Sequence, residues 1–113
     1  MKAILLETPI QVGDLDAGCD AYTHVRIIGI TSWSLETNRL TISCGQGYVD
    51  SEGNWNLGSV MGVRGFEILG DDYADAAGAV SSAADEKCMD GFIAQILSEL
   101  LEDNIYSGTV VDI

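Results

Sequence analysis

The stretch VRIIGITSWSLETNRLTISCGQGYV (residues 25–49) decides the fold, because it predicts two strands joined by a tight turn. In its first half, apolar side chains occupy both faces of an extended chain, with Val25, Ile27 and Trp33 on one face and Ile28 and Ile30 on the other. This pattern is typical of a strand that is covered on both sides or lies in an oligomer. The polar residues 35–38 (LETN) then predict a hairpin turn.

The second half of the stretch alternates more regularly. Leu40, Ile42 and Cys44 share one face of the predicted strand, as expected for a half-buried strand. Gly45 and Gly47 have no side chains to pack, and they suggest a bulge or a bend near the end of this strand.

The next segment, YVDSEGNWNLG (residues 48–58), fits either a calcium loop or the tip of a second hairpin. A calcium loop beginning at Asp50 requires Gly at position six and Glu at position twelve, but the chain has Trp55 and Met61 there. We therefore expect a solvated turn. Trp55 either packs back onto the sheet or is an anchor inserted into a neighbouring molecule.

The loop at residues 13–21 (GDLDAGCDA) has the same partial resemblance to a calcium site. Asp14, Asp16 and Asp20 occupy positions one, three and seven, but Cys19 and Val25 stand where Gly and Glu are needed. We expect solvated turn residues rather than a metal site, and the alternative is a weak ion site made jointly with another chain. Residues 2–12 before it predict a first strand rather than a signal peptide, because Glu7 and Pro9 interrupt the apolar run early.

The chain changes character after a further strand predicted within residues 63–70. From Asp71, Ala, Leu and Glu dominate, and Asp71 or Asp72 is a plausible helix N-cap. The helical segment, residues 71–104, is either one long helix or a helix broken near residues 78–82, where Ser81 and Ser82 would cap a second one. Apolar residues recur at helical spacing in its later part: Cys88 or Met89, Phe92, Ile93, Ile96, Leu97, Leu100 and Leu101.

These elements predict an α+β fold in which a small, mostly antiparallel sheet packs against a C-terminal amphipathic helix. The 113 residues form one domain, with residues 1–70 mainly β, 71–104 helical and 105–113 a final strand or an arm. Gly91 lies within the helical pattern, and we expect it to allow close approach to a strand.

The net charge of −13, from 18 acids and 5 bases, argues against binding to nucleic acid or to an anionic membrane. It favours a basic protein surface as partner. Residues 71–113 hold ten acids and one base, so an acidic docking face is expected in the C-terminal half. No apolar run reaches the ~20 residues of a membrane span.

Catalytic and cofactor signatures are not evident. His24 is the only histidine, and no nucleophile motif accompanies it. Cys19, Cys44 and Cys88 are scattered and odd in number, which predicts reduced thiols rather than a disulfide framework or a zinc site. We therefore expect a protein that is not an enzyme and has no cofactor.

Aromatic and β-branched residues are the candidates for a protein interface, because such residues are favoured in interface cores and in strands that pair with another chain. The expected interface residues are Trp33, Tyr48, Trp55, Tyr106, Val110 and Val111.

Residues 25–101 resemble small structural proteins of tailed bacteriophages. The resemblance rests on a D-x-x-G-x-W turn (Asp50, Gly53, Trp55) and an F-x-I-x-G-x-D-Y helix entry that begins at Phe66 and ends at Tyr73. It implies a head decoration, neck, tail or baseplate accessory subunit, made in the host cytoplasm and located in the virion. Its partners would be other virion proteins and copies of itself.

Two alternatives remain at this stage. One is an acidic regulatory or inhibitor protein that presents Asp85, Asp90, Glu99 and Glu102 to a basic partner. The other, ranked last, is a small hydrolase or metal-dependent enzyme.

Overall fold

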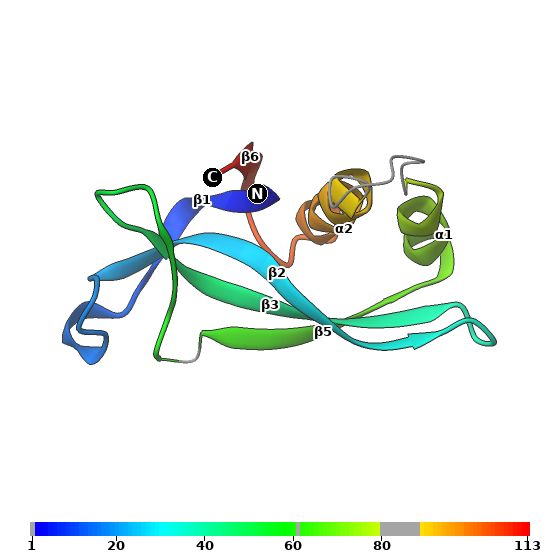
Figure 1. Ribbon diagram of the computed structural model, residues 1–113, viewed down its shortest axis with the longest axis horizontal. Helices are drawn as coiled ribbons and strands as arrows, with labels where there is room; N and C mark the ends of the chain where they lie inside the picture. The colour runs from blue at the N-terminus through cyan, green and yellow to red at the C-terminus, as the bar shows by residue number, and fades with distance from the viewer. Residues whose placement is uncertain (1, 61, 80–88) are drawn as a thin grey trace.

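The computed structural model describes residues 2–60, 62–79 and 89–113, which form an α+β fold with one six-stranded sheet and two α-helices. The elements are β1 (Lys2–Gln11), the 3-10 turn η1 (Gly13–Leu15), β2 (Ala21–Ser34), β3 (Arg39–Val49), β4 (Trp55–Leu57), β5 (Val63–Leu69), α1 (Gly70–Gly78), α2 (Asp90–Glu102) and β6 (Gly108–Asp112). The molecule is elongated, 44 × 26 × 22 Å, and both helices lie on the same side of the long β2–β3 hairpin (Figure 1).

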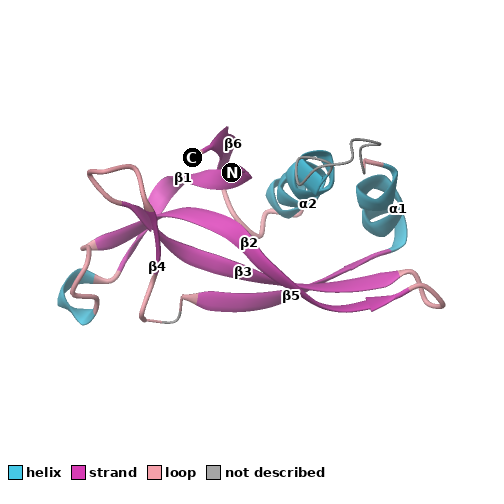
Figure 2. Cartoon of the chain, viewed as in Figure 1, coloured by secondary structure: helices cyan, strands magenta, loops and turns pink. Residues whose placement is uncertain are grey.

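The sheet is antiparallel in every strand pair, as the sequence predicts. Its order is β4-β3-β2-β1-β6, and β5 also pairs with β3. Strand β5 pairs with residues 39–45 of β3 and β4 with residues 47–49, so these two strands share one edge of β3 (Figure 2). The turn at residues 35–38 joins β2 to β3, and Asn38 has a φ of 51° there.

Strand β2 departs from the simple alternation that its sequence suggests. Its register against β3 shifts between Ile27 and Gly29 and again between Ile30 and Ser32. Ile30 is therefore opposite Ile42, and Trp33 is opposite Leu40. The two residues share one face of the sheet, although the alternation in the sequence predicts opposite faces. After the two irregularities Trp33 is again on the face of Val25 and Ile27, because each irregularity inserts one residue into a pattern of period two.

The two glycines of β3 do not mark a bulge. Gly45 pairs with Arg26 and Gly47 with His24, in uninterrupted register. The register shifts are in the partner strand instead, and the glycines have a packing role that is described below.

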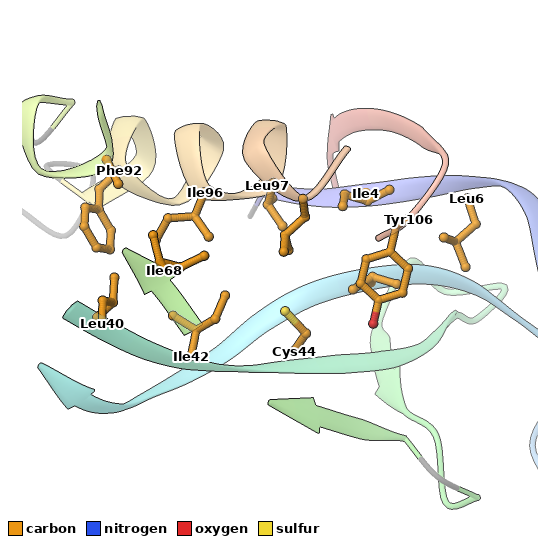
Figure 3. Packing of buried hydrophobic residues seen from close by; sticks show 13 residues of the cluster. Ile4, Leu6, Leu40, Ile42, Cys44, Ile68, Phe92, Ile96, Leu97 and Tyr106 are labelled. Carbon is orange, nitrogen blue, oxygen red and sulfur yellow. The ribbon is translucent and has the colours of Figure 1, made fainter. Parts of the chain in front are cut away.

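The hydrophobic core lies between the sheet and α2 (Figure 3). From α2, Phe92, Ile96 and Leu97 point toward the sheet, where they meet Leu40 and Ile42 of β3 and their neighbours. Burial of each such side chain contributes about 1.5–3 kcal/mol relative to exposure. The amphipathic pattern of residues 89–101 thus corresponds to a helix that covers one face of the sheet.

The described residues of the helical segment form two helices. The prediction of one long helix is therefore wrong. Helix α1 begins at Gly70, whose φ is +61°, and neither Asp71 nor Asp72 is its N-cap, because both lie in its first turn. Gly91 approaches the Ala79 carbonyl oxygen rather than a strand, since an added Cβ would come within 2.5 Å of that oxygen. The predicted caps Ser81 and Ser82 lie outside the described residues.

The C-terminal segment forms a strand of the same sheet. Strand β6 pairs with β1 from Lys2 opposite Asp112 to Leu6 opposite Gly108, and the Lys2 Nζ lies 3.0 Å from an Asp112 carboxylate oxygen. Within the described part of the chain, no helix is both long and apolar enough to cross a membrane.

Candidate functional site

The turn between β3 and β4 is held by the side chain of Asp50. Its Oδ1 accepts hydrogen bonds from the backbone N–H groups of Glu52 (3.0 Å) and Asn54 (2.9 Å), and its Oδ2 accepts one from Asn56 Nδ2 (3.1 Å). These bonds lower the pKa of Asp50, because they favour the ionised form. The carboxylate therefore stabilises a hairpin turn, and that turn positions Trp55 at the start of β4.

Trp55 packs on a floor made by the two glycines of β3. A Cβ on Gly47 would lie 3.0 Å from the Trp55 ring, and a Cβ on Gly45 would lie 2.8 Å from methyl carbons of both Ile28 and Leu57. Only glycine leaves room for this packing. The face of the sheet opposite α2 thus carries a cluster that we call the Trp55 face: Arg26, Ile28, Trp55 and Leu57 over Gly45 and Gly47.

The Trp55 face is partly exposed and lacks cover from the described helices. Ile28 is 39% exposed and Leu57 is 46% exposed, while Trp55 is half-buried. The Arg26 guanidinium carbon lies 5.7 Å from the centre of the Trp55 ring, a cation–π arrangement. Apolar groups around an aromatic ring with a polar rim are typical of surfaces that bind other proteins.

The Arg26 side chain contains a buried hydrogen-bond donor that has no acceptor among the described residues. This donor is the Nε. Burial lowers the pKa of Arg26, although an arginine remains charged at any physiological pH. A buried donor without an acceptor is unfavourable, so the Nε lowers the stability of this face in the isolated chain.

Acidic residues are rare on this face of the central strands. Among the residues of β2–β5 that share it by register, Glu67 is the single acid, and its carboxylate lies 3.7 Å from Arg39 Nη1. The net charge of −13 therefore comes from other parts of the chain. Two copies that met through the Trp55 face would bring few acids of the central strands into direct contact.

Trp33, another expected interface residue, lies on the helix-covered face of the sheet. Its ring stacks on Phe92 with centres 5.5 Å apart, and its Nε1 donates a hydrogen bond of 2.8 Å to the Tyr73 hydroxyl. It is 41% exposed, and it lies beside the turn that joins β2 to β3.

The other expected interface residues are dispersed. Tyr48 is half-buried beside Gly18, where an added Cβ would overlap the tyrosine hydroxyl. Tyr106 is a core residue, 7% exposed, and Val110 packs against the same core. Val111 is half-buried in β6 opposite Ala3. The structure does not bring the six residues together on one surface.

Sequence reasoning missed Arg26, Ile28 and Leu57 as neighbours of Trp55. The available signal was the spacing of Gly45 and Gly47, because glycines at alternate positions of a strand leave one face open to a large side chain from the next strand.

The Asp16 carboxylate joins two loops that are distant in sequence. Its Oδ2 accepts hydrogen bonds from the Tyr22 hydroxyl (2.7 Å) and the Ser59 N–H (2.9 Å), and its Oδ1 accepts one from the Gly18 N–H (3.0 Å). The Ser59 and Gly18 bonds are the main reason that the pKa of Asp16 falls to about 2. Asp14 and Asp20 are exposed in the same loop, and the described residues contain no group of three side chains suited to a metal ion.

The possible nucleophiles and bases have local roles. His24 Nδ1 lies 2.7 Å from Thr23 Oγ1, and burial lowers the pKa of His24. Burial raises the pKa of Cys44 to about 12, which keeps its thiol protonated and unreactive. Burial likewise raises the pKa of the half-buried Cys19, while Cys88 lies outside the described residues.

The acids of α2 do not form one exposed face. Asp90 and Glu102 are exposed, but Glu99 is only 4% exposed and accepts a 2.6 Å hydrogen bond from Gln95 Nε2. Asp85 lies outside the described residues. Burial of Glu99 removes one of the four acids on which an acidic docking helix would depend.

Comparison of the chain with protein-family models, with curated proteins and with solved structures finds no match.

Proposed function

We propose that the protein is a non-enzymatic structural subunit of a tailed-phage virion, which assembles with copies of itself and with other virion proteins through the Trp55 face. The phage setting follows from the resemblance of residues 25–101 to such proteins. The observation that carries the assembly role is the Trp55 face itself, where Ile28 and Leu57 are exposed beside a ring packed on glycine.

The chemistry of this face favours an interface between proteins. The aromatic ring and the aliphatic side chains supply apolar area, and the Arg26 guanidinium beside the Trp55 ring adds a positive charge. In a symmetric particle the same interface repeats many times, so a modest contact in each copy is sufficient.

Mass spectrometry of intact, purified virions tests the proposal. We expect peptides of this chain at a copy number that matches a symmetry of the head, neck, tail or baseplate. Detection of the chain in infected-cell lysate, together with its absence from virions of the same preparation, would overturn the virion role. Recovery of the chain bound to a basic host protein would favour the regulatory alternative instead.

A further inference from the structure

Two adjoining hollows form a groove beside the first residues of β5. Their volumes are about 700 Å³ and about 360 Å³, and both are lined by Ile10, Gln46 and Arg64. Pockets for small organic ligands commonly measure about 300–1,000 Å³. The groove lies apart from the cluster of side chains that makes up the Trp55 face.

The larger hollow has aliphatic walls. They come from β1, from the segment that follows it, from the β4–β5 connection and from the start of β5: Ile10, Val12, Leu15, Val60 and Val63. The ring of Tyr22 adds to this lining, and its hydroxyl is already bonded to Asp16. This hollow therefore suits an apolar chain.

Tyr106 lines the smaller hollow and carries a hydroxyl that lacks an acceptor among the described residues. Tyr106 is 93% buried, since its exposed fraction is 7%, and its ring lies edge-on to Phe66 with centres 5.9 Å apart. Its hydroxyl proton is buried and has no acceptor among the described residues, since the neighbouring Arg64 can only donate to the hydroxyl oxygen, and Figure 3 shows the hydroxyl directed away from α2. Burial raises the pKa of Tyr106, so at neutral pH the hydroxyl keeps its proton and is a donor without an acceptor.

Arg64 supplies a positive charge where the two hollows meet. Its guanidinium carbon lies 5.1 Å from the centre of the Phe66 ring and 5.8 Å from that of Tyr106. The guanidinium is close enough to offset part of the effect of burial on the pKa of Tyr106, but it gives the hydroxyl proton no acceptor. In a chain with 18 acids, none of the described carboxylates forms an ion pair with Arg64.

We propose that this groove binds an aliphatic monocarboxylate, with the carboxylate at Arg64 and Tyr106 and the hydrocarbon chain in the larger hollow. A carboxylate has two acceptor oxygens and no donor, and it therefore complements a guanidinium together with a phenolic O–H. The net negative charge of the chain disfavours anions elsewhere, and the aliphatic walls select against a small inorganic anion that has no apolar part.

Isothermal titration calorimetry of the full chain with octanoate tests the proposal, with 1-octanol as the uncharged control of equal chain length. We expect one octanoate per chain and binding of octanol that is at least about tenfold weaker, because octanol lacks the charge-assisted hydrogen bonds. Amide NMR shifts on addition of octanoate should be centred on Ile10, Val60 and Val63.

Two variants separate the ligand site from general effects. Arg64→Gln and Tyr106→Phe should each weaken octanoate binding about tenfold. Arg39→Gln, which removes the same charge from the opposite face of the sheet, should leave the affinity unchanged. Tyr106→Phe keeps the buried ring and removes a donor without an acceptor, so its melting temperature should be no lower than that of the unmodified chain.

The proposal fails if octanoate gives no heat and no NMR shifts with folded protein, or if octanol binds as tightly. It also fails if Arg64→Gln and Arg39→Gln have equal affinities. None of these results bears on the Trp55 face, because Tyr106→Phe and Arg64→Gln do not alter the residues that form it.

Discussion

Carboxylates at the two ends of the molecule have pKa values that are shifted in opposite directions. At the end that carries η1, Asp16 and Asp50 accept hydrogen bonds mainly from backbone N–H groups, and their pKa values fall. At the helical end, Asp72 of α1 interacts with Glu99 of α2 and with Asp103, which follows α2. Hydrogen bonding with Glu99 raises the pKa of Asp72, and hydrogen bonding with Asp72 raises that of Asp103.

The difference shows that the effect of an acid on stability depends on what surrounds it rather than on its charge alone. Ionised carboxylates at the loop end satisfy donors that would otherwise be unpaired, so they fix two loops in place. Ionised carboxylates at the helical end repel one another, so the contact between α1 and α2 is weakened when they lose their protons.

The largest effect is expected from Asp16→Ala. The change leaves the N–H groups of Ser59 and Gly18 without their acceptor and the Tyr22 hydroxyl with only the Val60 carbonyl, and the melting temperature should fall by roughly 10 °C. Asp14→Ala in the same loop is the matched control, because Asp14 is exposed, and it should change the melting temperature little. Equal melting temperatures for the two variants, measured by circular dichroism, would contradict the structural role of Asp16.

A smaller effect of opposite sign is expected from Asp103→Asn. At pH 7 this change removes repulsion from Asp72 and should raise the melting temperature by about 2 °C. Glu102→Gln is the control, since it removes the same charge from an exposed neighbouring position. A gain of the same size in both variants would mean that the effect comes from net charge and not from the carboxylate cluster.

The pKa shifts at the two ends also predict how the stability of the fold changes with pH. Asp72 and Asp103 have folded-state pKa values above 3.8, so the folded protein binds more protons there and gains stability as the pH falls from neutral through those values. Asp16 has a folded-state pKa of about 2, so its stabilisation is fully present above pH 3.8 and is lost as the pH falls toward 2. Stability should therefore pass through a maximum on the acid side of neutrality, and Asp103→Asn should flatten the rise toward it.

Features that depend on local sequence were predictable. The turn at residues 35–38, the alternation of Leu40, Ile42 and Cys44, and the apolar face of α2 are all visible in the sequence and present in the structure. Each depends on residues within a few positions of one another, where turn chemistry and side-chain period act directly.

Features that depend on distant partners were not predictable. The irregularities in β2 exist only relative to β3, and the role of Asp16 requires Ser59, 43 residues away. Burial of Tyr106 depends on Phe66 and the core around it, and burial of Glu99 depends on the position of α1. In the sequence these residues resemble ordinary surface tyrosines and acids, since pattern rules contain no information about tertiary neighbours.

Sedimentation velocity of the purified chain and of Leu57→Asp tests assembly through the Trp55 face most directly. The unmodified chain should sediment as a concentration-dependent oligomer, and Leu57→Asp should be monomeric with an unchanged circular dichroism spectrum, because the new charge lies at an exposed position of that face. Leu35→Asp, in the β2–β3 turn and 79% exposed, adds the same charge elsewhere and should still assemble. A monomeric unmodified chain at high concentration, or equal assembly of the two variants, would contradict the account.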